Sequence, residues 1–144
     1  MKVLLQRVSE AAVDIGGERV AQIGAGLLVL VGVAPEDGDA ELRWLADKTL
    51  GLRIFADAEK PMNRSVVDIQ GELLVVSQFT LTADTRKGKR PGFSTAAPPA
   101  HAEAIYTKFV DELRQTLPVQ TGQFGADMQV SLVNDGPVTF MLER

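Results

Sequence analysis

The sequence contains no cysteine and only one histidine, His101, among its 144 residues. The lack of cysteine excludes disulfides and thiolate metal sites, which fits a reducing compartment. A single histidine gives little support to Ser-His-Asp, Cys-His or zinc constellations, each of which needs further partners. His101 follows two prolines at an expected helix start, so the simpler interpretation is an exposed residue of the first turn. We therefore expect no metal ion.

Long apolar runs and nucleotide-binding motifs are also missing. No apolar run approaches the roughly 20 residues that span a membrane, and the N-terminus, Met1 to Arg7, is charged too early for a signal peptide. No GxGxxG follows a strand and no Gly-Lys-Ser/Thr phosphate loop is present, so we expect no cofactor. The sequence thus predicts a cytoplasmic protein without membrane contact.

The net charge is −4, so the molecule as a whole does not favour a nucleic-acid partner, and no DNA is expected. One segment has the opposite charge. Thr85 to Phe93 reads TRKGKRPGF and places four cations in five positions: Arg86, Lys87, Lys89 and Arg90. Its glycine and proline residues indicate a loop rather than a helix. This segment, the basic loop, fits an ordinary solvated loop, which is the common case, but it also fits a loop that contacts the phosphates of tRNA.

Hydrophobic periodicity predicts one α+β domain over residues 1–144, with a mostly antiparallel sheet and two covering helices. One amphipathic helix is expected from Asp39, a candidate N-cap, to an end near Gly51 or Phe55, and another from Pro98 until Pro118 stops it. Strands are expected over residues 2–9, in a hairpin over residues 11–24, over residues 26–33 and 71–81, and in two closing strands.

Two polar segments follow or interrupt apolar strands. Ser77-Gln78-Phe79-Thr80 ends the strand expected over residues 71–81. It fits either ordinary hydrogen bonding at a strand end or a small pocket whose N–H groups and hydroxyls face a polar substrate. Asn134-Asp-Gly-Pro137 separates two alternating runs and predicts a hairpin. Proline is unexpected there, because it removes a donor where strand pairing should resume.

The segments SQFTL (Ser77 to Leu81) and NDGPVT (Asn134 to Thr139) resemble the two signature motifs of the D-aminoacyl-tRNA deacylase family. Nearly the whole chain is similar to that family, through QRV from Gln6, IGAGLLVLVGV from Ile23, LGLRIFADAE from Leu50, RPGFS from Arg90 and ADMQVSLVNDGPVTF from Ala126. The resemblance implies hydrolysis of the ester between the 3′-terminal adenosine of tRNA and a D-amino acid. It also implies action on glycine mischarged on the alanine tRNA, whereas L-aminoacyl-tRNA is left intact.

The resemblance further implies a homodimer of β-barrel-like α+β subunits with two active sites at the interface. Gly136-Pro137 would take a cis peptide bond and enter the pocket of the partner subunit. There the carbonyls of this turn would contact the α-amino group of the substrate and crowd the position of an L side chain. Arg7 would brace the turn.

Within the pocket, the resemblance implies that the 2′-hydroxyl of the adenosine assists ester cleavage. Gln78 and Phe79 would offer backbone N–H groups to the oxyanion, and Ser77 would line the pocket. Phe79 and Phe124 would supply apolar surface near the adenosine, although Phe124 also fits ordinary packing. Thr80 has the chemistry of a nucleophile, but nothing in the sequence activates it, so we interpret it as a positioning residue.

Two other functions stay open from the sequence. A nucleic-acid-binding module without catalysis would use the basic loop, but it would not need both signature segments. A relative that removes L-amino acids from mischarged tRNA is the second alternative. In that branch both motifs differ from the forms that this chain carries, so the D-specific interpretation is favoured.

Overall fold

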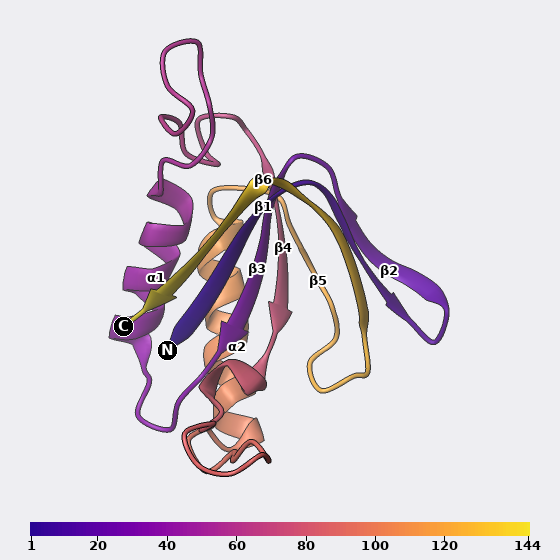
Figure 1. The fold of residues 1–144 in the computed structure, drawn as a ribbon, viewed down its shortest axis with the longest axis vertical. Coiled ribbons are helices and arrows are strands. Elements are labelled where there is room, and N and C mark those ends of the chain that lie inside the picture. Colours follow the sequence, from indigo (N-terminus) through magenta and orange to yellow (C-terminus); the bar gives the residue numbers. More distant parts are fainter.

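The structure of the chain, a computed structural model, describes all residues from 1 to 144. It consists of one strongly curved sheet and two helices (Figure 1). The strands are β1 (Lys2–Ile15), β2 (Glu18–Ile23), β3 (Gly26–Gly32), β4 (Glu72–Ser77), β5 (Val119–Thr121) and β6 (Gln129–Glu143). The helices are α1 (Asp39–Gly51), α2 (Pro99–Arg114) and the short 3-10 helix η1 (Phe79–Thr82).

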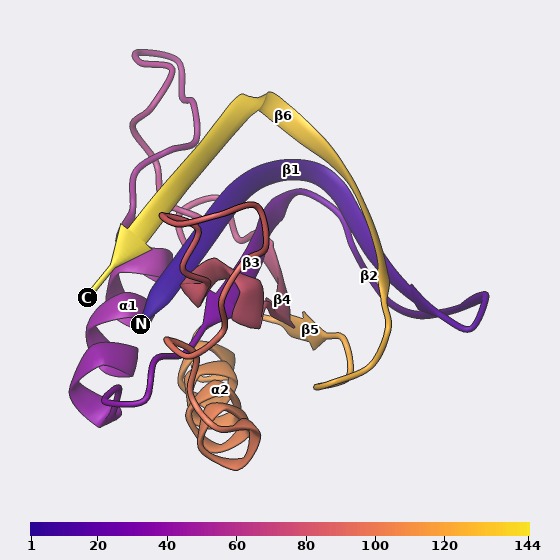
Figure 2. The same cartoon turned by 60° about the horizontal axis from the view of Figure 1, so that its bottom comes forward.

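Strand β1 organises the sheet, because it pairs with three other strands. Its antiparallel partners are β2, β3 and β6, whereas β3 with β4 and β4 with β5 pair in parallel. The strand order is β2-β1-β3-β4-β5, and β6 joins through β1. Figure 2 shows β1 and β6 arching together over the other elements. The expected α+β fold with a mostly antiparallel, barrel-like sheet is confirmed.

Both helices lie beneath this arch and close the main hydrophobic core (Figure 2). Leu27 of β3 and Leu73 of β4 belong to that core, whereas Leu28 and Leu74 belong to a second cluster under the β1–β2 hairpin. Strands β3 and β4 are therefore covered on both faces, as their continuous apolar runs predict. Neither helix is long and apolar enough to cross a membrane.

The strand predicted over residues 71–81 is shorter than expected and ends at Ser77. The chain turns into η1, where the N–H of Leu81 donates to the Gln78 carbonyl at 3.1 Å. Alternation of apolar and polar residues does not distinguish this tight turn from a continuing strand. The polar segment at the end of β4 therefore lies on a turn and not within the sheet.

The two predicted helices are present with small differences at their ends. Gly38, and not Asp39, is the N-cap of α1, and the N–H of Gly38 donates to the Glu41 carboxylate at 2.9 Å. Helix α2 ends at Arg114, short of Pro118. These differences do not change which helix faces are buried.

The hairpin expected around the second polar segment is wrong, because β6 is one strand whose two halves both pair with β1. Asn134 pairs with Val8 of β1. The next pair along the ladder joins Thr139 to Gln6, so residues 135–138 lie opposite a single residue of β1. This four-residue bulge accommodates the proline, because a residue outside the ladder needs no N–H donor.

The outer face of β6 is uncovered. In Figure 2 no helix or strand lies over the outer side of the arch that β6 forms. Val133, Phe140 and Met141 expose 50%, 36% and 49% of their surface. Large apolar side chains gathered on one exposed strand are typical of a surface that binds another protein.

Candidate active site

A pocket of about 510 Å³ opens at the carboxyl end of β4. Ser77, Gln78 and Phe79 form part of its wall, and Tyr106 of α2 and Phe124 form another part. Of the 16 residues that line the pocket, 11 are hydrophobic. This composition suits a mostly apolar or aromatic group that is oriented by a few polar contacts.

The polar segment at the end of β4 has its own hydrogen bonds. The N–H of Gln78 donates to the Val31 carbonyl at 2.7 Å, and its side-chain Nε2 donates to Thr80 Oγ1 at 2.5 Å. The first bond inside η1 starts from Leu81, so the N–H groups of Phe79 and Thr80 have no acceptor within the turn. The three residues before Thr80 line the pocket, whereas Thr80 does not.

Tyr106 is a pocket residue that the sequence did not single out. Its hydroxyl donates to the Val75 carbonyl at 2.9 Å, and its ring packs against Phe124 with 5.9 Å between the ring centroids. Burial raises the pKa of Tyr106 to about 12, so the hydroxyl is a neutral donor near pH 7. In the sequence, Tyr106 shares the helical spacing of the core side chains and cannot be told apart from them. Phe124 both lines the pocket and packs against the main core.

Arg7 and Asn134 support the bulge in β6. Arg7 Nε donates to the Asp135 carbonyl at 3.0 Å, and Arg7 Nη1 donates to the Ile54 carbonyl at 2.6 Å. Asn134 Nδ2 donates to the carbonyls of Arg7 and Val138, at 3.0 Å each. These side-chain bonds occupy backbone acceptors that the interrupted ladder leaves without a partner.

The bulge holds Gly136 and Pro137 on the surface. The peptide bond between them is cis, and both residues are exposed. Gly136 has a φ of +132°, and a Cβ there would lie 2.7 Å from Val138 Cγ2, so the position requires glycine. Neither Gly136 nor Pro137 lines the pocket of its own chain, and Arg7 does not line it either. The two signature segments are therefore separate within one chain.

The basic loop is closed at its base by a pair of backbone bonds. Asp84 N–H donates to the Gly92 carbonyl at 2.9 Å, and Gly92 N–H donates to the Asp84 carbonyl at 2.8 Å. Arg86 folds back onto the Asp84 carboxylate, with Nε 2.9 Å from Oδ1 and Nη2 2.8 Å from Oδ2. This guanidinium holds the pKa of Asp84 well below its usual range.

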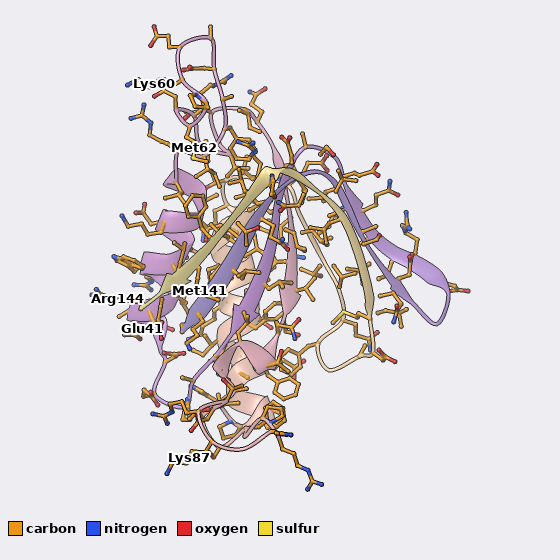
Figure 3. All side chains as sticks on the ribbon, in the orientation of Figure 1. Glu41, Lys60, Met62, Lys87, Met141 and Arg144 are labelled. Atoms are coloured by element: carbon orange, nitrogen blue, oxygen red, sulfur yellow. The ribbon has the colours of Figure 1, made fainter.

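The other three cations of the loop, Lys87, Lys89 and Arg90, are exposed and take part in no ion pair. Lys87 lies at the lower end of the molecule and points away from it (Figure 3). The loop therefore presents three free positive charges rather than four. The sequence alone does not predict that Arg86 pairs with Asp84, because its only indication is that an acidic residue lies two positions earlier.

A second cleft, of about 660 Å³, lies where the two chain ends meet. Its lining is largely polar or charged, and the amino group of Met1 donates to Asp37 Oδ1 at 2.6 Å. His101 is half-buried, with Nε2 2.9 Å from the Asp37 carbonyl, and lines neither cavity. No group of three or more His, Cys, Asp or Glu side chains could hold a metal ion. We place the site in the smaller pocket, because it contains the polar segment of β4.

The fold and the pocket define a class of protein. It is an α+β domain whose pocket is lined mainly by apolar side chains with a few polar ones, and it has no histidine or lysine among the lining residues. The family model described as D-Tyr-tRNA(Tyr) deacylase matches residues 4–143. The chain belongs to this family of aminoacyl-tRNA deacylases, which are ester hydrolases, as the SQFTL and NDGPVT segments led us to expect.

Individual relatives are similar over nearly their whole length. A D-aminoacyl-tRNA deacylase of Chlorobaculum parvum is 59% identical over 145 residues, which cover 99% of this chain and 97% of that protein. A D-aminoacyl-tRNA deacylase of Pseudomonas aeruginosa is 60% identical over 144 residues and 99% of both chains. The solved structure of a protein named c-Myc DNA Unwinding Element Binding Protein superposes with a TM-score of 0.95 at 44% identity, covering 100% of this chain and 99% of that one.

Tyr106 is the only tyrosine in the sequence, so its ionisation can be followed by tyrosinate absorbance. We expect tyrosinate to form near pH 12 in the folded protein and near pH 10.0 after unfolding in urea. Because the folded state binds this proton more tightly, its contribution to stability is complete below pH 10.0 and is lost as the pH rises toward about 12. A folded-state transition near pH 10.0 would contradict the burial of the hydroxyl.

The matched variant is Tyr106→Phe, which keeps the ring and removes the hydroxyl. In this variant the free energy of unfolding should no longer show the alkaline pH dependence that Tyr106 contributes. The substitution should also lower the free energy of unfolding by about 1–3 kcal/mol, because the Val75 carbonyl is left without its donor. Urea unfolding at several pH values measures both effects.

Proposed function

We propose that the protein hydrolyses the ester between a D-amino acid and the 3′-terminal adenosine of tRNA, releasing the amino acid and the tRNA and sparing L-aminoacyl-tRNA. The main support for this proposal is that the two signature segments, SQFTL and NDGPVT, lie in different places on one chain. Ser77 to Phe79 line a pocket that suits a nucleoside, whereas the Gly136-Pro137 turn is held on the surface outside it. The names of the relatives in Chlorobaculum parvum and Pseudomonas aeruginosa support the substrate class.

The exposed turn of one subunit would complete the pocket of a second copy. A twofold arrangement makes the two contacts equivalent, since each subunit inserts its turn and receives that of its partner. Val133, Phe140 and Met141, which are exposed along β6 on both sides of the bulge, supply apolar surface for this contact. Arg7 holds the turn in place before a partner arrives, which reduces the ordering cost of association.

The turn would select chirality by exclusion. One hydrogen bond to the α-amino group contributes about 0.5–3 kcal/mol, which is at most a discrimination of about a hundredfold. Rigid backbone at the place of an L side chain discriminates more strongly, because the wrong substrate then clashes. Glycine has no side chain, so the same filter would admit glycyl-tRNA, including glycine mischarged on the alanine tRNA.

The proposed chemistry uses the substrate's own hydroxyl. The 2′-hydroxyl of the terminal adenosine would assist attack of water on the ester carbonyl, and the intermediate would collapse to a free carboxylate and a 3′-hydroxyl. The N–H of Phe79 would donate to the oxyanion, whereas Gln78 could do so only by releasing the Val31 carbonyl. Thr80 accepts a bond from the Gln78 side chain, so we assign it to holding this segment in place.

The remaining pocket residues would bind the substrate. Ser77 would orient the aminoacyl group, and the apolar surface of Phe124 would contact the adenosine. Lys87, Lys89 and Arg90 would contact tRNA phosphates outside the pocket, and Arg86 would join them only by leaving Asp84. We expect RNA rather than DNA as the partner, because the proposed chemistry needs the 2′-hydroxyl that DNA lacks.

The selectivity is tested with three substrates. The purified protein should release tyrosine from D-tyrosyl-tRNA and glycine from glycyl-tRNA, and it should leave L-tyrosyl-tRNA intact. The D-to-L ratio of kcat/KM should exceed the roughly hundredfold that one hydrogen bond provides. Release of labelled amino acid at matched tRNA concentrations measures this ratio. Cleavage of both tyrosyl enantiomers at similar rates would refute the exclusion filter.

The role of Thr80 is tested against that of the substrate hydroxyl. Thr80→Ala should keep kcat within about tenfold of the unchanged protein, because it loses one hydrogen bond and no reacting group. Replacing the terminal 2′-hydroxyl of D-tyrosyl-tRNA by hydrogen should lower kcat by about 10²–10⁴-fold, the usual range for a lost acid–base group. A folded Thr80→Ala protein without turnover, together with cleavage of the deoxy substrate, would identify Thr80 as the nucleophile.

The dimer is tested with a pair of matched methionine variants. Met141 on β6 and Met62 in the loop after α1 are 49% and 45% exposed, and they lie apart on the molecule (Figure 3). Met141→Lys should place two like charges in the proposed twofold interface, yielding monomers with little deacylation. Met62→Lys should remain dimeric and active. Light scattering measures the oligomeric state, and a deacylation assay on the same samples measures activity. An active monomer would refute the cross-subunit site.

A further inference from the structure

Two exposed phenylalanine rings connect the pocket to the basic loop. Phe79 and Phe93 are 56% and 43% exposed, and their ring centroids lie 5.0 Å apart with the planes inclined at 52°. Phe79 lines the pocket, and Phe93 comes directly after the closed base of the basic loop. Neither ring belongs to the two hydrophobic clusters of the fold. Exposed aromatic surface that the core does not need indicates a binding surface.

Both rings are held on one supported unit. Phe79 is the first residue of η1. The carbonyl of Phe93 accepts a bond from the N–H of Ala96 at 3.1 Å, which forms a turn directly after the basic loop. The hydroxyl of Thr95 donates to the Thr82 carbonyl and so ties this turn to η1. The two backbone segments that carry the rings are therefore joined to each other and are not two independent loops.

We propose that Phe79 and Phe93 form a stacking platform for the base of the penultimate nucleotide, the one directly 5′ of the terminal adenosine. The proposal rests on the proposed function, which places the adenosine in the pocket that Phe79 lines. The next nucleotide then leaves the pocket beside this ring. Lys87, Lys89 and Arg90 stand free on the adjoining loop and can accompany its phosphates.

The chemistry of the platform matches an RNA strand better than a protein. Single-stranded nucleic acids bind where aromatic rings stack on bases beside cations that follow the backbone. A protein partner would account for the two rings but not for three unpaired cations next to them. Stacking accepts any base, because every base has a flat π-face, so the platform would add affinity without reading sequence. The 3′ end of every tRNA could then use the same surface.

The first experiment compares three D-tyrosyl esters: those of adenosine, of the dinucleotide CpA, and of a dinucleotide with an abasic sugar in place of cytidine. Stacking on an aromatic side chain typically contributes an effect of roughly 5- to 150-fold. We expect kcat/KM for CpA to exceed that for the abasic dinucleotide by a factor in this range. Phe93→Ala should reduce this ratio toward one, and Phe93→Tyr should restore it. Exchanging cytidine for another base should have little effect.

Lys89→Ala is the matched control, because it removes a phosphate contact and leaves the rings in place. It should lower kcat/KM for CpA and for the abasic dinucleotide by a similar factor, so that their ratio is preserved. A wild-type ratio near one would overturn the platform. An equal loss for all three esters in Phe93→Ala would also overturn it, since Phe93 would then only support the fold or a subunit contact.

A binding measurement keeps the platform testable if the esters are not cleaved. An RNA hairpin with a single-stranded CCA end is synthesised with a fluorescent base analogue, quenched by stacking, at the penultimate position. Wild-type protein should change its emission on binding, and Phe93→Ala should not. An unchanged emission despite saturating binding would refute the platform. Failure of the wild-type protein to cleave D-tyrosyl-tRNA itself would refute the proposed function instead.

Discussion

The bulge in β6 is the constraint on which the proposed site depends. Residues 135–138 face a single residue of β1, Arg7, whose guanidinium donates to backbone carbonyls on two sides. Asn134 occupies two more carbonyls, and Val138 returns the chain to the core with 7% exposure. Gly136 and Pro137 can therefore project from the sheet without unravelling the strand on either side. A plain hairpin would have ended the sheet at this point.

The other half of the site depends on close backbone approach. A Cβ on Gly32 of β3 would lie 3.1 Å from the Gln78 carbonyl and 3.0 Å from Leu81 Cβ, so η1 packs directly onto a glycine. The N–H of Gln78 bonds to Val31 in the same strand, and Tyr106 supports β4 through the Val75 carbonyl. These contacts tie the pocket wall to the sheet. Two well-supported halves of the site that do not meet in one chain are the physical reason for proposing a second copy.

Periodicity predicted the helices, the buried strands and the covering of β3 and β4 on both faces. It failed where a residue's role depends on a distant partner. Asn134 bonds to the Arg7 carbonyl across 127 positions of sequence, so a local pattern of turn residues was indistinguishable from a hairpin. Tyr106 likewise shares its spacing with core residues, and its hydroxyl bond to Val75 cannot be read from the helix. The pairing of Arg86 with Asp84 shows the same limit, since counting cations overstates the charge that is free to bind phosphate.

In the proposed mechanism the protein selects and positions the substrate, and the reacting hydroxyl belongs to the substrate. The titratable lining residues of the pocket are Tyr106, whose hydroxyl is neutral near pH 7 and whose pKa burial raises further, to about 12, and Asp127, which is exposed. Neither is placed as a partner for a nucleophile, so the proposed protein contribution is to hold the ester and the adenosine in position. Positioning alone can supply a large part of a rate enhancement when the reacting group is already attached to the substrate. The same backbone support would serve the proposed chirality filter, because a backbone that yielded to an L side chain would also misplace the ester.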